Sequence, residues 1–301
     1  RLIRRQRQMC IRDRHRMHPI IREFIDAVAY GNRLEDAPEL ESQLADIVSQ
    51  PPEPGAAFVV YNTGTLFACC YRDGVTFSRF NPRSAALAIL LAQEVLKHGT
   101  ERVGIITPYA TQAQLLQRMI RALQATGKIQ ASTVHRFQGS EAPVVILDLA
   151  DGRPLPNVGL PLDDSCNPDA KRLVTVALSR AQARCIVLAN VLYFRDRLAS
   201  NTVVRQLVDF ASSHGLIRDP TRVGAAISCA GVQWYRDTEE ALRQLRADLR
   251  SAKKEVSILW PAILDSRQFP IPELSFASQR GVAIAVGGDE DVARNLVGKI
   301  R

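Results

Sequence analysis

The chain has 301 residues, of which 46% are hydrophobic and 23% charged, and its formal net charge is +8. This composition is typical of a globular protein long enough for two domains, and it excludes disordered, collagen-like and disulfide-dense chains. The longest apolar run, Ala85 to Ala92, is far shorter than the roughly 20 residues that cross a membrane, so we expect no membrane association. Six cysteines without a C-x-x-C pair argue against a zinc cluster and favour buried thiols in a reducing, cytoplasmic compartment.

The positive charge gathers at the amino terminus. Residues 1–22 hold eight arginines and one acidic residue, Asp13, so they supply +7 of the net charge. The string MCIRDR, from Met9 to Arg14, resembles the translation of a transposase adapter used in sequencing libraries. We therefore expect residues 1–14 to be an artefactual, non-native basic segment, and the alternative is a natural basic arm. The chain begins without methionine, and we expect it to be a piece of a longer protein.

Predicted helices and strands alternate over the first two thirds of the chain. Apolar residues at helical spacing predict helices over 19–30, 82–97, 112–126, 171–183 and 203–214. Nearly continuous apolar runs predict strands over 57–61, 103–107, 130–134, 144–149 and 185–189. The polar stretch 32–55 predicts a loop or a weak helix. This alternation predicts an α/β fold with a doubly wound parallel sheet.

A second unit is expected near the carboxyl terminus. Residues 219–231 begin with Asp-Pro and predict a linker, which places the first domain at 15–218 and the second at 232–301. Within the second domain the pattern predicts helices over 238–253 and 272–279 and strands over 256–260 and 282–286.

Four short segments carry the candidate chemistry. They read HRMHP at 15–19, GIITPY at 104–109 followed by Gln112, STVHRFQGSE at 132–141, and TVALSRA at 175–181. Thr107 ends a predicted strand and Pro108 with Tyr109 forms a rigid turn, while Thr133 ends another strand. Ligands of doubly wound sheets bind at the carboxyl ends of strands, so a ligand backbone could lie there.

Two arginines and a tight turn suggest a phosphate site. Gly139 gives a turn that brings backbone N–H groups and Glu141 close to a ligand. Arg180 on a predicted helix and Arg16 before another offer planar cations that suit phosphate oxygens. Two arginines near one phosphate favour phosphoryl transfer, where catalysis is mainly positioning and charge stabilisation.

Taken singly, each of these features has a plainer interpretation. A Thr-Pro-Tyr sequence is usually a turn, and a helical arginine is usually solvated or in a weak surface ion pair. His18 and His135 alone are more often packed or capping residues than ligands.

Together and in this order, the four segments resemble the second RecA-like domain of superfamily 1 helicases. The branch is that of the nonsense-mediated-decay helicase and its DNA-processing relatives. The family pattern is Gln-Tyr-Arg-Met-His-Pro, then a strand with Thr-Pro-Tyr and a following Gln, then Thr-Val-x-x-Phe-Gln-Gly-x-Glu, then Asn-Val-Ala-Leu-Thr-Arg-Ala. The resemblance covers about residues 15–214 and implies a RecA-like sheet and an ATP-dependent helicase that moves 5′-to-3′.

The resemblance implies roles for individual residues. The implied catalytic residues are Arg180 and Arg16, which reach the γ-phosphate of ATP across an interdomain cleft, and Gln138, which couples the nucleotide state to the grip on the strand. The implied nucleotide-binding residues are Gly139 near the phosphates, Glu141 at the ribose and His15 beside the adenine. The implied contacts with single-stranded DNA or RNA are Thr107, Pro108, Tyr109 and Thr133. Such backbone contacts give salt-dependent, sequence-tolerant binding, and both DNA and RNA fit them.

The chain departs from the family pattern in several places. Arg14-His15 stands where the family has Gln-Tyr, and an imidazole stacks less well than a tyrosine ring. Ser179 replaces a threonine and keeps its hydroxyl. Residues 151–169, before the fourth segment, are more polar than is usual in the family.

A phosphate-binding loop sequence, G-x-x-x-x-G-K-[ST], is absent from the 301 residues. The only Gly-Lys pairs, at 127–128 and 298–299, are each followed by isoleucine. We therefore expect a missing amino-terminal RecA-like domain to hold most of the ATP and its Mg²⁺, and we expect this chain alone to be inactive as an ATPase.

The second domain resembles the opening half of a phospholipase D-like domain at residues 242–260 and 280–286. The catalytic signature of that family, H-x-K-x-x-x-x-D, does not occur, and the alternative is a generic α/β appendage. Two other functions stay open for the whole chain. One is a nucleic-acid-binding module that does not unwind, against which Arg180, Gln138 and Glu141 argue, and the other is the motor part of a phospholipase D-like nuclease or phosphodiesterase.

Overall fold

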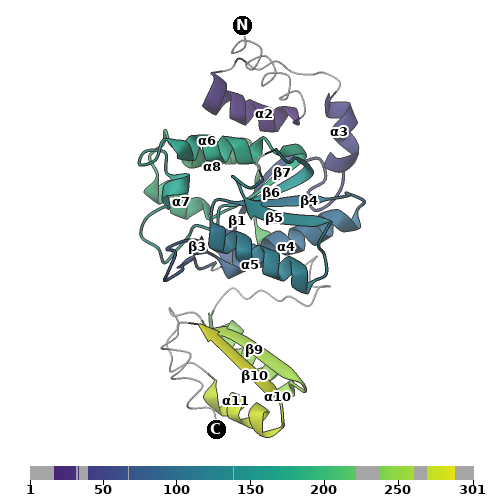
Figure 1. Cartoon of the computed structure of the whole chain (residues 1–301), viewed down its shortest axis with the longest axis vertical. Helices are drawn as coiled ribbons and strands as arrows, with labels where there is room; N and C mark the ends of the chain where they lie inside the picture. Colours follow the sequence, from purple (N-terminus) through teal and green to yellow (C-terminus); the bar gives the residue numbers. More distant parts are fainter. Residues whose placement is uncertain are drawn as a thin grey trace. The chain divides into compact units, whose positions relative to one another are not determined.

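The computed structural model describes residues 17–31, 33, 40–66, 68–137, 139–221, 238–260 and 270–288. The chain divides into two units, Arg1–Val232 and Gln233–Arg301, and each is described by itself (Figure 1). His15, Arg16, Gln138, the expected non-native segment 1–14 and most of the expected linker lie outside the described residues.

A parallel six-stranded sheet forms the centre of the first unit, with strand order β5-β4-β6-β7-β1-β8. The strands are β1 (Phe58–Asn62), β4 (Val103–Thr107), β5 (Ile129–Thr133), β6 (Ala142–Asp148), β7 (Ala181–Ala189) and β8 (Ile217–Arg218). The central strands are buried along nearly their whole length, because helices cover both faces of the sheet (Figure 1). The predicted α/β, RecA-like fold is confirmed.

The helices divide between the two faces of the sheet. One face packs against α2 (Pro19–Ile25), α6 (Asp169–Leu178), α7 (Val191–Arg197) and α8 (Val203–Ser213), whose apolar residues join the main core. The other face is covered by α4 (Pro82–Lys97) and α5 (Ala110–Ala122) (Figure 1). Asn81 begins α4 as predicted, since its side chain accepts a hydrogen bond from the Ser84 N–H at 3.1 Å.

Three predicted helices have limits in the structure that differ by more than two residues. The helix expected over 112–126 is α5, Ala110–Ala122. The helix expected over 171–183 ends at Leu178, and β7 begins at Ala181 because Ala181 pairs with Ala142 of β6. The helix expected over 19–30 changes at residue 26 into a π-helix, Asp26–Tyr30, which ends at Gly31 with φ of 63°. The backbone there needs a left-handed residue, which glycine supplies at least cost.

Several short elements were not predicted. They are the 3-10 turns Thr63–Leu66 and Leu160–Leu162 and an antiparallel hairpin of β2 (Tyr71–Arg72) and β3 (Arg79–Phe80), besides α7 and β8. The stretch 32–55, predicted to be a loop or a weak helix, contains the helix α3 (Leu40–Val48). The segment after α3 is fixed by Arg184 of β7, which is 1% exposed. Its guanidinium donates hydrogen bonds of 2.6–3.2 Å to the carbonyl oxygens of Val48, Gln50, Pro51, Glu53 and Ala56. A buried arginine thus substitutes for a ladder of backbone hydrogen bonds.

The second unit consists of α10 (Thr238–Ser251), β9 (Glu255–Trp260), α11 (Ile271–Gln279) and β10 (Ala283–Gly288). Each lies within two residues of its predicted limits. The two strands pair in parallel, and Leu249, Ile258 and Leu274 form the centre of a small core. Across the described part of the whole chain, every helix is too short or too polar to cross a membrane.

Candidate nucleotide and nucleic-acid sites

The parallel sheet has two distinct ends. At one end, here called the carboxyl end, β4 and β5 finish together, with Thr107 opposite Thr133. At the other, here called the amino end, β6 and β7 start together, with Ala142 opposite Ala181. The predicted site residues fall into two groups, one at each end.

Three of the four sequence segments meet at the amino end. The Ala142 N–H donates a hydrogen bond of 3.1 Å to the carbonyl oxygen of Arg180. The Gln182 side chain donates to Glu141 Oε2 at 3.1 Å, and the Gln182 carbonyl accepts from the His18 N–H at 2.8 Å. The chain around 18, the turn at 139–142 and the turn at 179–182 are therefore neighbours in space, although up to 164 residues separate them in sequence.

Arg180 is half-buried just beyond the end of α6, and it does not lie within the helix as predicted. Its Nε donates to the Val176 carbonyl at 3.3 Å, and its Nη2 lies 3.5 Å from Ser179 Oγ. No carboxylate of the described residues forms an ion pair with it. These few, long hydrogen bonds leave most of the planar guanidinium donors available to an anion.

Gly139 is exposed and has φ of 88°, a conformation that other residues rarely adopt. A Cβ atom placed on it would meet nothing within 4 Å. Glycine is therefore required here by the backbone, and the space beside the turn is open. Glu141, two residues later, is half-buried.

His18 is a capping residue, which agrees with its plainer interpretation. Its Nδ1 accepts a hydrogen bond of 3.4 Å from the Ile20 N–H at the start of α2. Burial lowers the pKa of His18, and nearby Glu41 opposes that shift. His135 is exposed.

The segment between β5 and β6 joins the two ends of the sheet. Thr133 lies at the carboxyl end, and Ala142 starts β6 at the amino end, so the chain must cross a face of the sheet between them. Phe137, 1% exposed, anchors this crossing. A Cβ on Gly104 would come within 2.6 Å of the Phe137 ring, so only glycine on β4 leaves room for it.

The carboxyl end is more closed than the sequence suggests. Thr107 is 0% and Tyr109 5% exposed, whereas Pro108 and Thr133 are half-buried. The Tyr109 ring lies 6.0 Å from the Arg79 guanidinium carbon, and its hydroxyl lies where a Cβ of Gly159 would be. The predicted side-chain contacts of Thr107 and Tyr109 therefore face the protein interior, and Pro108 and Thr133 supply the surface.

A buried polar network joins the end of β6 to α4 and α5 around Asp148, which is 0% exposed. Gln112 Nε2 donates to Asp148 Oδ2 at 2.5 Å, the Ala150 N–H donates to Oδ1 at 3.0 Å, and Ser84 Oγ also donates to Oδ1. Burial raises the pKa of Asp148 to about 6, and these hydrogen bonds partly oppose the shift. Gln112 also exchanges two hydrogen bonds with the Asn81 backbone.

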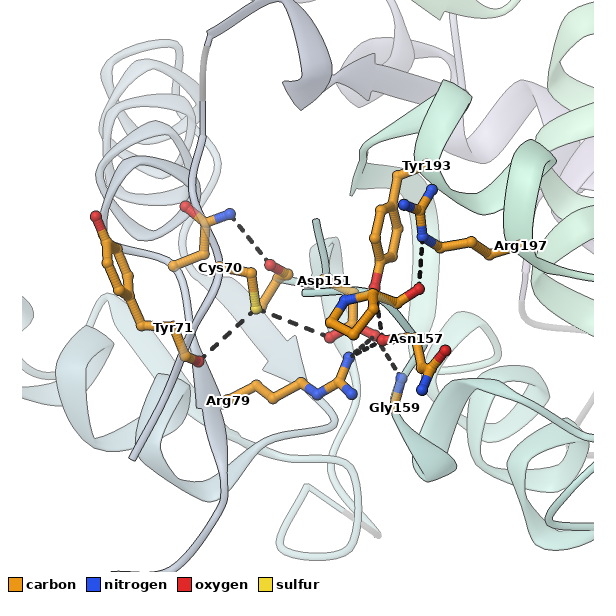
Figure 2. A network of polar contacts seen from close by, with 11 residues as sticks. Cys70, Tyr71, Arg79, Asp151, Asn157, Gly159, Tyr193 and Arg197 are labelled. Atoms are coloured by element: carbon orange, nitrogen blue, oxygen red, sulfur yellow. Dashed lines mark hydrogen bonds and ion pairs between the residues drawn. The ribbon is translucent and has the colours of Figure 1, made fainter. Parts of the chain in front are cut away.

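A second network fixes the segment after β6 (Figure 2). Asp151 Oδ2 accepts from Arg79 Nη1 at 2.8 Å and from the Gly159 N–H at 2.7 Å. The Asn157 carbonyl accepts from Arg79 at 2.9 Å and from the Tyr193 hydroxyl at 2.6 Å. Burial raises the pKa of Asp151 although Arg79 opposes it. This ion pair secures residues 151–159 over Tyr109.

Comparison with known proteins shows the family of this chain. Residues 1–192 match the model of a family described as an AAA domain, AAA_12. The chain belongs to this AAA domain family. The match begins at residue 1 and so includes the arginine-rich stretch 1–14.

Curated relatives of this AAA domain are much longer than the chain. Helicase sen1 of Schizosaccharomyces pombe is 26% identical over 222 residues, which cover 71% of this chain and 12% of that protein. The DNA replication ATP-dependent helicase/nuclease JHS1 of Arabidopsis thaliana is 27% identical over 192 residues, covering 60% and 14%. The helicase/nuclease DNA2 of Bos taurus is 27% identical over 141 residues, covering 46% and 12%. The chain thus spans 12–14% of the length of these relatives.

Among solved structures, the C-terminal domain of a possible DNA helicase from Lactobacillus plantarum is 13% identical, with a TM-score of 0.34. The alignment covers 64% of this chain and 92% of that one.

Sequence reasoning missed several residues that shape the carboxyl end of the AAA domain. Arg79 and Asp151 are 72 residues apart, and no local sequence pattern predicts that they pair. Asp148 gave a usable signal, since an acidic residue that ends an apolar strand must find buried donors. Gln112 links the Asn81 backbone to the Asp148 side chain, and this role becomes evident only when both partners are known from the structure.

Proposed function

We propose that the first unit is the second motor domain of an ATP-dependent superfamily 1 helicase, a hydrolase that moves 5′-to-3′ on single-stranded DNA or RNA. The observation that carries the proposal is the division of the motif residues between the two ends of one sheet. Gly139, Glu141 and Arg180 gather at the amino end, and Pro108 and Thr133 reach the surface at the carboxyl end. The family and the helicase relatives support the same conclusion.

The amino end suits a nucleotide phosphate. Arg180 has guanidinium donors to spare, and the turn at Gly139 is open. In the proposed arrangement Arg180 stabilises charge on the γ-phosphate of ATP, Gly139 lies near the phosphates and Glu141 near the ribose. Arg16, Gln138 and His15 complete the set by family resemblance.

A partner domain is needed for hydrolysis. The 301 residues lack a phosphate-binding loop sequence, and the described residues contain no cluster of three or more metal-ligating side chains. We therefore assign most of the ATP contacts and Mg²⁺ to an amino-terminal RecA-like domain of the same parent protein. ATP bound there supplies the phosphoryl group, while Arg180 contributes a fixed cation from this side of the cleft.

The segment 134–141 offers a path between the two activities. It follows Thr133, beside which the nucleic acid would bind, and ends at Glu141, beside which the nucleotide would bind. The Phe137 ring is packed tightly against Gly104 on the face of the sheet. A movement of the segment at Thr133 is therefore passed on to Glu141, because the packed ring leaves no room for a local rearrangement between them. This is the proposed coupling between nucleotide state and grip on nucleic acid.

For the second unit, we propose the opening half of a phospholipase D-like domain. Its order of helix, strand, helix and strand, with β9 and β10 parallel, supports this proposal. A parent protein that is a nuclease or phosphodiesterase is the corresponding second candidate function.

The described cysteines fit the proposed cytoplasmic compartment. Cys70, Cys166 and Cys185 are thiols outside any disulfide. Burial raises the pKa of Cys70 and Cys185, so these two remain protonated and unreactive at neutral pH.

The proposal is tested by fluorescence anisotropy of labelled single-stranded oligonucleotides with the full chain. We expect binding that tolerates changes of sequence and weakens with salt, with a log–log slope of about −2 to −4 for a handful of phosphate contacts. Thr133→Ala should weaken binding several-fold. The matched control is Thr126→Ala, an exposed threonine at the amino end of the sheet. Absence of binding, or equal effects of the two substitutions, would overturn the assignment.

A parallel assay measures ATP hydrolysis by the same chain. We expect no hydrolysis above the buffer rate, with or without oligonucleotide. Hydrolysis that depends on Arg180 would show that no partner domain is needed.

A further inference from the structure

The hairpin of β2 and β3 carries an apolar tip that the proposed function has not used. The tip, residues 73–78, joins Arg72 to Arg79. Its two apolar side chains are the most exposed large hydrophobic residues of the described chain, Val75 at 87% and Phe77 at 67%. Exposure of this kind costs solvation free energy and marks a contact surface when several such groups lie together.

The tip is held in one conformation. The Asp73 N–H donates to the Ser78 carbonyl at 2.8 Å, and the Phe77 N–H donates to the Asp73 carbonyl at 3.0 Å. Asp73 Oδ1 accepts from the N–H groups of Val75 at 3.2 Å and Thr76 at 2.7 Å. These hydrogen bonds lower the pKa of Asp73, so its carboxylate is committed to the loop.

Phe77 has φ of 56°, in the left-handed region that disfavours bulky side chains. The surrounding hydrogen bonds therefore hold the ring outward at a conformational cost. Because the Phe77 ring is exposed, the first unit gains no buried contact in return for this strain.

The hairpin is mounted rigidly at its base. Arg79 of β3 makes the buried ion pair with Asp151 at 2.8 Å, and the rings of Tyr71 and Phe80 stack with centroids 5.5 Å apart. Ser78 Oγ accepts a hydrogen bond of 3.1 Å from the Thr111 N–H.

Thr111 lies in the first turn of α5, three residues after Pro108. In Figure 1, β3 accordingly lies beside α5. The tip is therefore a neighbour of the Pro108 turn, and through the pairing of β4 with β5 it belongs to the same end of the sheet as Thr133.

We propose that Phe77 is a base-stacking platform for the single strand whose backbone lies over Pro108 and Thr133. The proposal rests on the proposed function and adds a contact with the bases. A preordered ring loses little entropy when a base stacks on it, and every base has a face to offer, so stacking keeps binding tolerant of sequence. Arg72, exposed on the same hairpin, supplies positive charge for the adjoining phosphate.

The test compares Phe77→Ala with Phe77→Tyr in the full chain, with a fluorescein-labelled oligothymidylate as the probe. Stacking on an aromatic side chain predicts a loss of about fivefold or more in affinity for Phe77→Ala and near-native affinity for Phe77→Tyr. The matched control is Leu123→Ala, because Leu123 is 48% exposed and follows α5, which runs from the carboxyl end toward the amino end. Thermal unfolding of all three variants shows whether they remain folded.

A set of oligothymidylates with one abasic site moved along the chain gives the decisive result. At one position the missing base should weaken binding to the wild-type protein, and that penalty should vanish in Phe77→Ala, because ring and base act as a pair. Equal affinity of Phe77→Ala and wild type for the intact probe, or an unchanged abasic penalty, would overturn the stacking role and leave the tip as a protein contact. If the wild-type chain binds no oligonucleotide, the proposed function itself fails, which is a separate outcome.

Discussion

The two ends of the central sheet use their motif residues in opposite ways. At the amino end, Arg180 and Gly139 make few internal contacts and leave donors or space unused. At the carboxyl end, Thr107, Tyr109 and Gln112 are buried and engaged by other parts of the protein. Motif residues at the amino end therefore keep groups available for a ligand, whereas motif residues at the carboxyl end hold the fold together.

The difference between the two ends arises from where buried carboxylates lie. Parallel strands end together at the carboxyl end, where buried Asp148 and Asp151 must be given donors. Gln112 donates a hydrogen bond to Asp148, and Arg79 donates one to Asp151. The amino end has no such buried carboxylate beside Arg180 among the described residues, so its cation stays available.

The largest expected effect is at Arg180. In a longer protein that supplies the phosphate-loop domain, Arg180→Ala should lower kcat for ATP hydrolysis by about 10³-fold or more, because a cation at the transferred phosphate is lost. Arg172→Ala, an exposed arginine of α6, is the matched control and should leave kcat unchanged. A loss of less than about tenfold would remove Arg180 from the phosphate site.

Gln112→Ala tests the opposite end and should act on stability. It removes two hydrogen bonds to Asn81 and one to Asp148, leaving buried groups without partners, so we expect a loss of about 4 kcal/mol in the free energy of unfolding. Gln114→Ala, exposed on the same helix, should change it by less than about 0.5 kcal/mol. Denaturant unfolding measures both, and similar values would refute a structural role for Gln112.

Asp148 makes the stability of the carboxyl end depend on pH. Its pKa of about 6 in the folded protein lies above its ordinary value of about 3.9, so the folded state binds the proton more tightly. The stability that this group contributes is complete below about pH 4 and is lost as the pH rises through 6. Relative to Asp148→Asn, the wild-type free energy of unfolding should therefore fall by roughly 2 kcal/mol between pH 4 and 7. A difference that does not vary with pH would contradict the raised pKa of this buried carboxylate.

A smaller effect is expected at the segment over Tyr109. Gly159→Ala would place a Cβ 2.0 Å from the Tyr109 hydroxyl and 3.2 Å from the Arg79 guanidinium carbon, and should cost about 2 kcal/mol. Tyr109→Phe should relieve part of that cost in the double variant. Gly74→Ala meets nothing within 4 Å and is the control. Additive effects in the double variant would mean that residue 159 does not pack on Tyr109.

The sequence was sufficient for the order of the main strands and helices, because apolar runs and helical spacing are local signals. The limits of β7 were wrong because pairing between Ala181 and Ala142 overrides helix propensity around residue 181. The burial of Tyr109 could not be predicted, since it depends on the Arg79–Asp151 pair across 72 residues.

The sequence predicted which residues form the candidate site better than it predicted where on the sheet they lie. Motif order alone suggested that Arg180, Glu141 and Gly139 act together, and hydrogen bonds around Ala142 bring their chain segments side by side. The expectation that ligands gather at the carboxyl ends of strands gave no reason to look at the amino end. The hairpin tip at Phe77 escaped notice because a short hairpin has too little periodicity to be recognised.

Hydrogen exchange of the full chain with and without a saturating oligothymidylate tests the division between the two ends most directly. The account predicts the strongest slowing of exchange in peptides covering 73–78, 108–111 and 133–136. It predicts a smaller change at 139–142, which the segment 134–141 connects to Thr133, and unchanged exchange at 179–182. Protection confined to the amino end, with the carboxyl end unchanged, would contradict it.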